Sequence, residues 1–168
     1  MRQQEALLRV TNNVATGGDR TESGGKRMLG QLLGEVRGRV TSLRALSSEG
    51  LESEVEISIA GEGTLLGKPV SDIGTYTQRL RPNGTAYADG HVILRSADGE
   101  MAPWKGFGIS HFVGEGLAIN VAAVGAFHGA TPGFERLNEV AAVTEYQVDP
   151  EGNYHYQLWE WLGPNQTE

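Results

Sequence analysis

The chain lacks cysteine altogether and has few aromatic residues. Aromatic side chains make up only 7% of its 168 residues. Without cysteine, a disulfide scaffold, a thiolate nucleophile, a zinc–thiolate site and iron–sulfur chemistry are all excluded. The four histidines stand far apart, and none has the short spacing to another that metal-binding motifs show. The sequence therefore predicts no metal and no cofactor, with haem held by a single histidine as the alternative that stays open.

Motifs of several other protein classes are also absent. The chain has no phosphate-binding loop, no glycine-rich dinucleotide fingerprint followed by a helix, and no Gly-x-Ser-x-Gly of hydrolases. No apolar run reaches the roughly 18–20 residues of a membrane helix, and the first residues lack signal-peptide features. These absences predict a cytoplasmic protein.

Charge is distributed unevenly along the chain. The net charge is −7, yet residues 1–44 carry eight basic against four acidic side chains, and residues 45–168 carry six against seventeen. Nucleic acids and anionic membranes are polyanions, which an acidic surface repels. We therefore expect no nucleic-acid partner and no membrane partner.

The composition changes after about residue 27. Residues 1–27 are polar apart from a short apolar patch, which predicts an N-terminal extension that is mobile or a short helix. Residues 28–168 are predicted to form one domain, because apolar and polar residues alternate there in blocks closed by turn residues. The eight blocks are Leu32–Leu46, Leu51–Leu66, Asp72–Arg81, Thr85–Ser96, Ala102–Phe112, Leu117–His128, Leu137–Val148 and Tyr154–Leu162.

Short connections between these blocks determine the expected architecture. Asn83-Gly84 and Asp98-Gly99 are strong markers of type I′ hairpins, and no connection has the dozen residues of a parallel crossover. Eight antiparallel strands in a meander remove their open edges by closing, and the 24 glycines fit the bends that closure needs. The prediction is an all-β, eight-stranded antiparallel up-and-down β-barrel, which holds side chains or one small ligand. A two-sheet sandwich is the alternative.

The barrel region resembles a known family. The likeness rests mostly on turn and closure residues: Gly61-Glu62-Gly63-Thr64-Leu65-Leu66-Gly67, Asp89-Gly90-His91, Asp98-Gly99-Glu100, Trp104-Lys105-Gly106-Phe107-Gly108, Leu137-Asn138, Gly152-Asn153 and Trp159-Glu160-Trp161. From Leu32 to Leu162 the chain resembles calycin-like barrels, most closely the allene-oxide-cyclase-like group with its uncharacterised bacterial members. The resemblance implies the barrel fold, and either cofactor-free cyclisation of a reactive or polyene substrate or plain small-molecule binding. No catalytic residue of the family matches this sequence position by position, so none is carried over.

The block Leu117–His128 is apolar or small on both faces. Such a strand is expected to be covered on its outer side, by the N-terminal extension or by a second subunit. One face is a run of alanines, which leaves space for bulky neighbours or for a ligand. Asn120 stands alone on that face, so we expect this amide either to pair across the barrel or to bind a ligand.

The last block places polar and aromatic side chains together. Glu160 shares one face with two tyrosines, and Trp159 and Trp161 lie on the other. If Glu160 is internal, desolvation raises its pKa and suits it to act as a general acid. If the tryptophan face is internal, it forms a ligand-stacking wall or simply core.

These patterns predict a barrel that takes one small, apolar organic molecule into its cavity. In its sharper form the hypothesis is a cofactor-free cyclase or isomerase, whose cavity folds the substrate while a hydrogen-bond donor polarises an oxygen. The candidate catalytic residues are Glu160, Tyr146, Tyr76 and Asn120, and the candidate ligand-binding residues are Trp104, Phe127, Trp159, Trp161 and His128. The alternative is a non-catalytic carrier or an oligomeric structural barrel. A homo-oligomer, dimer or trimer, is expected in either case.

Overall fold

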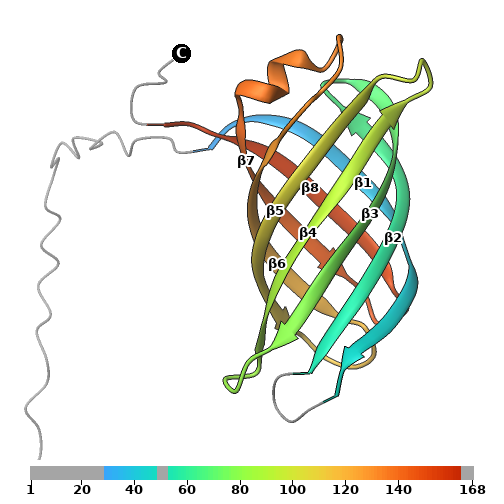
Figure 1. The fold of residues 1–168 in the computed structure, drawn as a ribbon, viewed down its shortest axis with the longest axis vertical. Helices are drawn as coiled ribbons and strands as arrows, with labels where there is room; N and C mark the ends of the chain where they lie inside the picture. Colours follow the sequence, from blue (N-terminus) through green and yellow to red (C-terminus); the bar gives the residue numbers. More distant parts are fainter. Residues whose placement is uncertain (1–28, 49–52, 164–168) are drawn as a thin grey trace, which may run out of the picture.

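Alternating apolar and polar residues form eight antiparallel strands. In the computed structural model, which describes residues 29–48 and 53–163, these are β1 (Leu29–Ser47), β2 (Glu54–Leu65), β3 (Lys68–Leu80), β4 (Thr85–Ser96), β5 (Met101–Phe112), β6 (Ile119–Phe127), β7 (Ala141–Val148) and β8 (Asn153–Trp161). Each strand pairs with the next, and β8 pairs with β1 to close the barrel (Figure 1). The predicted eight-stranded up-and-down barrel is confirmed, and the two-sheet sandwich is wrong.

The N-terminal extension predicted for residues 1–27 lies outside the described residues. Within the described part of the chain, no helix has the length and apolarity needed to span a membrane.

The strand boundaries differ most from the prediction at β3 and β7. β3 begins at Lys68 rather than at Asp72, because the preceding hairpin turns through only Leu66 and Gly67. Both turn residues have positive φ, 48° and 76°, which leucine seldom adopts and which the sequence pattern does not reveal. β7 begins at Ala141, because a 3₁₀ helix, η2 (Glu135–Glu139), occupies the start of the predicted strand.

The turn at Asn83-Gly84 is longer than the type I′ turn predicted for it. The backbone N–H of Gly84 donates to the carbonyl of Arg81 (3.1 Å), and that of Arg81 donates to the carbonyl of Thr85 (2.8 Å). These bonds define a three-residue loop that ends in a glycine of positive φ, and Asp98-Gly99 forms the same loop. The two-residue turn with positive φ at both positions occurs instead at Leu66-Gly67.

Strand parity decides which side chains enter the barrel. On β6 the bulky Ile119, Val121 and Phe127 are buried in the interior, whereas Ala122 and Ala126 are exposed. These alanines therefore face outward. The expectation that their face leaves space for a ligand inside the barrel is wrong.

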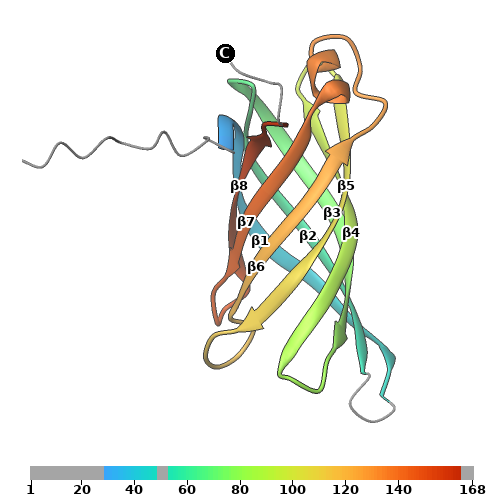
Figure 2. The same cartoon turned by 90° about the vertical axis from the view of Figure 1, so that its left-hand side faces the viewer.

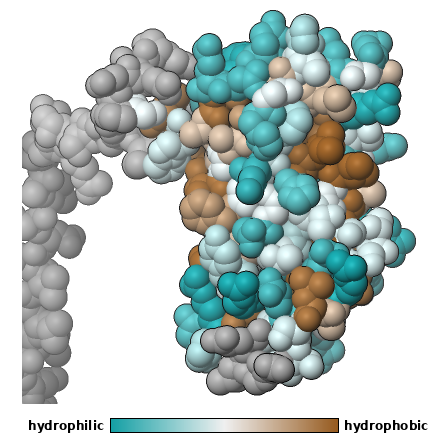
Figure 3. Space-filling view, viewed as in Figure 1, coloured by the Kyte–Doolittle hydropathy of each residue, from teal (hydrophilic) through white to brown (hydrophobic). Residues whose placement is uncertain are grey.

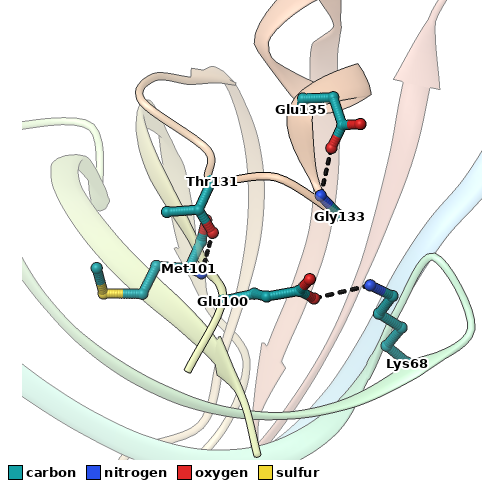
Figure 4. Close-up of polar contacts among 6 residues, drawn as sticks. All are labelled: Lys68, Glu100, Met101, Thr131, Gly133 and Glu135. Carbon is teal, nitrogen blue, oxygen red and sulfur yellow. Dashed lines mark hydrogen bonds and ion pairs between the residues drawn. The ribbon is translucent and has the colours of Figure 1, made fainter. Parts of the chain in front are cut away.

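The segment between β6 and β7 covers one end of the barrel (Figures 1 and 2). It buries Phe134 and Leu137 completely against the core. The Lys68 ammonium lies 5.2 Å from the centre of the Phe134 ring and forms an ion pair with Glu100 (2.7 Å). Figure 4 shows these two side chains pointing toward each other, Lys68 from the start of β3 and Glu100 from the residue just before β5. Beside them, the backbone N–H of Met101 donates to the Thr131 hydroxyl (2.8 Å), and the backbone N–H of Gly133 donates to the Glu135 carboxylate. This end is therefore plugged by side chains.

Candidate functional site

A cavity of about 80 Å³ lies in the barrel, bordered by residues of β2 to β8. Along β4 and β5 its wall includes Gly90, Gly106 and Gly108, which leave the backbone bare. The indole of Trp104 packs so closely over Gly106 that a methyl group there would overlap it. Gly106 therefore makes room for the Trp104 side chain on this wall.

Two tyrosines from opposite parts of the sheet meet at this cavity. The hydroxyls of Tyr76 on β3 and Tyr146 on β7 lie 3.4 Å apart, and their rings cross edge to face at 78° with centroids 6.0 Å apart. Both side chains border the cavity. Burial raises the pKa of both phenols, so each is a neutral hydroxyl that can donate or accept a hydrogen bond.

A buried carboxylate lies next to the tyrosines. Asp72 on β3 is 1% exposed, and it accepts hydrogen bonds from the hydroxyls of Tyr154 (2.6 Å) and Tyr156 (3.2 Å) on β8. The rings of these tyrosines stack 6.0 Å apart, and Tyr146 stacks on both. Gly61 of β2 makes the arrangement possible, because a Cβ there would overlap the Tyr154 hydroxyl. Asp72, Tyr154, Tyr156, Tyr146 and Tyr76 form one continuous group, which we call the tyrosine cluster.

Desolvation raises the pKa of Asp72, and the two tyrosine hydroxyls oppose this shift by stabilising the charge. Burial likewise raises the pKa of Tyr154 and Tyr156, and the neighbouring negative charge of Asp72 adds to this effect. The phenols therefore remain protonated and act as donors to the carboxylate.

The raised pKa of Asp72 predicts a specific pH dependence. Below the ordinary value of 3.8 the carboxyl is protonated in the folded and unfolded chain alike, so its contribution to stability is fully present. As the pH rises from there through the folded-state pKa, the unfolded chain ionises more readily and the folded state loses stability. Asp72→Asn keeps the shape without titrating, so its free energy of unfolding relative to wild type should increase from pH 4 to pH 7. Urea unfolding at each pH measures the difference, and a difference that does not vary with pH would contradict the assignment.

Two polar atoms beside the cavity have no hydrogen-bond partner within residues 29–48 and 53–163. They are the indole nitrogen Nε1 of Trp104 and the hydroxyl Oγ1 of Thr144. Both atoms are fully buried. A buried polar group without a partner is costly, which makes these atoms the natural contact points for a bound molecule.

Three of the predicted site residues border this cavity, namely Tyr76, Tyr146 and Trp104. Phe127 is buried and lies opposite Trp104 in the pairing of β5 with β6, but it packs in the core without bordering the cavity.

The other predicted residues lie elsewhere. Asn120 is exposed on the outer side of β6, so the expected buried amide is not found. Glu160 forms an ion pair with Arg136 of η2 (2.9 Å) and is not a carboxyl isolated in apolar surroundings. Trp159 packs at an outward position of β8, opposite Val143. The last two side chains are open to solvent: Trp161 is 38% exposed, and His128 is exposed just beyond β6.

The four histidines lie at exposed or outward positions, although His91 is also among the residues that border the cavity. His91, His111 and His155 occupy outward positions of their strands, and His155 contacts Glu35 at 2.8 Å. No histidine therefore occupies an inward strand position from which it could hold a haem inside the barrel. Among the described residues, no three metal-ligating side chains gather at one place.

Asp72, Tyr154, Tyr156 and Thr144 belong to the site but are not among the residues predicted from the sequence. The sequence predicts a strand that begins at Asp72, because Gly67-Lys68-Pro69 is typical of a turn, whereas Lys68 and Pro69 belong to β3. With the correct start of β3, the period of two puts Asp72 and Tyr76 on the same inward face, which is the signal that could have revealed it.

Comparisons with known proteins support the fold. No protein-family model and no curated protein matches this chain. Its structure is similar to a conserved protein of unknown function from Rhodopseudomonas palustris (TM-score 0.67, 17% identity, covering 80% of this chain and 98% of that one). It is also similar to a protein with unknown function from Clostridium acetobutylicum (TM-score 0.68, 14% identity, 80% and 97%). A third similar structure is a β-barrel-like protein from Acinetobacter baumannii (TM-score 0.64, 18% identity, 80% and 95%). At these identities the comparisons place the chain among small β-barrel proteins by fold alone.

Proposed function

We propose that this barrel binds one small, largely apolar organic molecule in the cavity beside the tyrosine cluster. The observation that carries the proposal is the pair of buried, unpartnered polar atoms, Trp104 Nε1 and Thr144 Oγ1, on residues that border the same cavity. A ligand that pairs with either atom recovers a hydrogen bond that folding has left unmade. Apolar neighbours such as Ile59, Val121 and Leu158 supply the rest of the contact surface.

The size of the cavity restricts the ligand. Pockets for drug-sized molecules usually measure about 300–1,000 Å³, whereas this cavity measures about 80 Å³. A polyene or another long flexible chain does not fit in this conformation. The proposed ligand is therefore compact, unlike the substrates of the cyclases in the family that the sequence resembles.

If the barrel is an enzyme, the proposed chemistry is a cofactor-free isomerisation or cyclisation of that compact ligand. The resemblance to allene-oxide-cyclase-like barrels supports this form of the proposal. The neutral hydroxyls of Tyr76 and Tyr146 border the cavity and can donate a hydrogen bond to an oxygen of the substrate. Tyr156 also borders the cavity and is connected through its hydroxyl to Asp72, which provides a path for a proton away from the site.

Filling the cavity tests the binding proposal. Ala123 on β6 borders the cavity, so Ala123→Leu should occupy the space that the ligand needs. Native mass spectrometry of wild type purified from its own host should show the protein mass plus a small molecule, and Ala123→Leu should show the protein mass alone.

The matched control is Ala122→Leu, which makes the same change at the exposed outer position next to it. This variant should retain the added mass. Retention by Ala123→Leu as well would place the ligand outside the cavity and contradict the proposal.

The second candidate function is an oligomeric structural barrel without a ligand, favoured by the apolar side chains on the outer wall. Ile73 and Phe107 are 61% and 54% exposed, and Ile93 and Val124 lie on neighbouring strands. Figure 3 shows apolar patches between polar ones on the face over β3 to β5. The same mass spectrum separates the candidates, because a dimer or trimer without any added mass favours the structural role.

A further inference from the structure

We infer that the cavity ligand is a short, neutral carbonyl compound, held through its oxygen by the buried donors Trp104 Nε1 and Thr144 Oγ1. The inference rests on the proposed function and narrows the class of molecule that the cavity takes.

The hydrogen-bonding groups at the cavity call for an acceptor. An indole N–H only donates, so the group that pairs with Trp104 must accept a hydrogen bond. The Thr144 hydroxyl can also donate, and a carbonyl oxygen has two lone pairs with which to accept from either group. A plain hydrocarbon would leave both atoms unpaired. Tyr76 and Tyr146 add two more hydroxyls to the border of the same cavity.

The charges around the cavity call for a neutral ligand. No lysine or arginine is among the residues that border it in the described chain, so a buried carboxylate or phosphate would have no counter-charge. The titratable side chains of Asp89 and His91 border the cavity but are exposed at outward positions of β4, and Asp89 accepts a hydrogen bond from the Thr77 hydroxyl (3.1 Å). A cationic ligand therefore finds no buried carboxylate at this border, and both oxygens of the nearby Asp72 already accept hydrogen bonds from Tyr154 and Tyr156. A carbonyl group carries no net charge and satisfies both conditions.

The volume sets the length of the molecule. An engineered apolar cavity of about 150 Å³ in another protein holds benzene, which has six carbon atoms. A cavity of about 80 Å³ is roughly half that size. It therefore suits a ketone, aldehyde or ester of roughly four to six non-hydrogen atoms once the walls relax slightly around it.

Two probes of the same ring size separate the role of the oxygen from that of the apolar surface. Cyclopentanone has the acceptor, and cyclopentane lacks it. The full-length protein is titrated with each, and binding is followed by NMR through the indole N–H signals, of which the Trp104 signal is identified by its loss in Trp104→Phe. Cyclopentanone should shift the Trp104 N–H signal, which reports a new hydrogen bond directly.

The variant that tests the contact is Thr144→Val, which removes the hydroxyl and keeps the shape. We expect it to weaken cyclopentanone binding about tenfold, the effect of one hydrogen bond to a buried group, and to leave cyclopentane binding unchanged. Thr64→Val, at an exposed position of β2, is the matched control and should change neither. Trp104→Phe is the second variant if Thr144→Val does not fold, with the same expected loss for the ketone.

The outcomes distinguish this inference from the proposed function. Two outcomes would overturn the carbonyl inference but not the binding proposal. In the first, cyclopentane binds and cyclopentanone does not. In the second, cyclopentanone binds, but Thr144→Val and Trp104→Phe leave its affinity unchanged, which means that water satisfies the two donors. If neither probe binds at millimolar concentration, both the inference and the proposed function fail. If both variants weaken the binding of cyclopentanone and not that of cyclopentane, the result supports both the carbonyl inference and the proposed function.

Discussion

Replacing Asp72 with alanine is expected to lower the free energy of unfolding by about 4 kcal/mol. The change removes the common acceptor of two buried hydroxyls, those of Tyr154 and Tyr156. Each buried donor left without a partner costs about 1–3 kcal/mol, and the small void adds to the loss. Urea unfolding followed by tryptophan fluorescence measures the effect.

Asp89→Ala is the matched control for this variant. Asp89 lies on the neighbouring strand β4, is exposed, and accepts a hydrogen bond only from the Thr77 hydroxyl (3.1 Å) among the bonds described for it. Its loss should change stability by less than about 0.5 kcal/mol. Equal losses in the two variants would mean that the tyrosine cluster does not depend on its carboxylate.

Phe134→Ala is expected to cost about 3–5 kcal/mol. The ring is completely buried where the segment before β7 closes the barrel, and it also lies under the Lys68 ammonium. Its removal leaves a large void, which Leu137 and the surrounding core cannot fill unless the segment between β6 and β7 moves. Thermal and urea unfolding measure the loss, which should appear as a lower midpoint with an unchanged urea dependence.

The control for Phe134→Ala is Phe107→Ala, because this phenylalanine is 54% exposed on the outer wall, where its ring stacks with that of Tyr87. It should cost less than about 1 kcal/mol. A small effect of Phe134→Ala would show that the segment between β6 and β7 is not part of the cooperative core.

The strands could be predicted from the sequence because their physical signal is local. Apolar and polar residues alternate along each strand, and glycine marks most turns, as at Gly84 and Gly99. The turn before β3 also contains a glycine, Gly67, but its other residue is a leucine, Leu66, at a positive φ that leucine seldom adopts. Lys68 and Pro69 are typical turn residues in the sequence, yet they pair with β2 and begin β3. Only the tertiary structure imposes that conformation, so the start of β3 could not be located in advance.

The site was predicted only in part, because its geometry depends on contacts between distant strands. Aromatic residues at inward positions, such as Tyr76, Tyr146 and Trp104, could be proposed from their strand patterns. The inward direction of each strand could not be fixed where both faces are apolar, and for β6 the alanine face with Asn120 turned out to be the outer one. Asp72 meets Tyr154 across 82 positions of sequence, a contact that no local pattern encodes.

The closure of β1 against β8 has a consequence for biosynthesis. Chains are made from the N-terminus, so β1 is synthesised before the other strands of the barrel, and its second partner, β8, is the last of these strands. Until β8 is made, the edge of β1 that pairs with it, from Leu29 to Arg39, remains open to pairing with other chains. The outward residues along this stretch of β1 include Glu35, Arg37 and Arg39. Charged side chains on an open strand disfavour edge-to-edge association, so these three residues protect the nascent chain during the interval before the barrel can close.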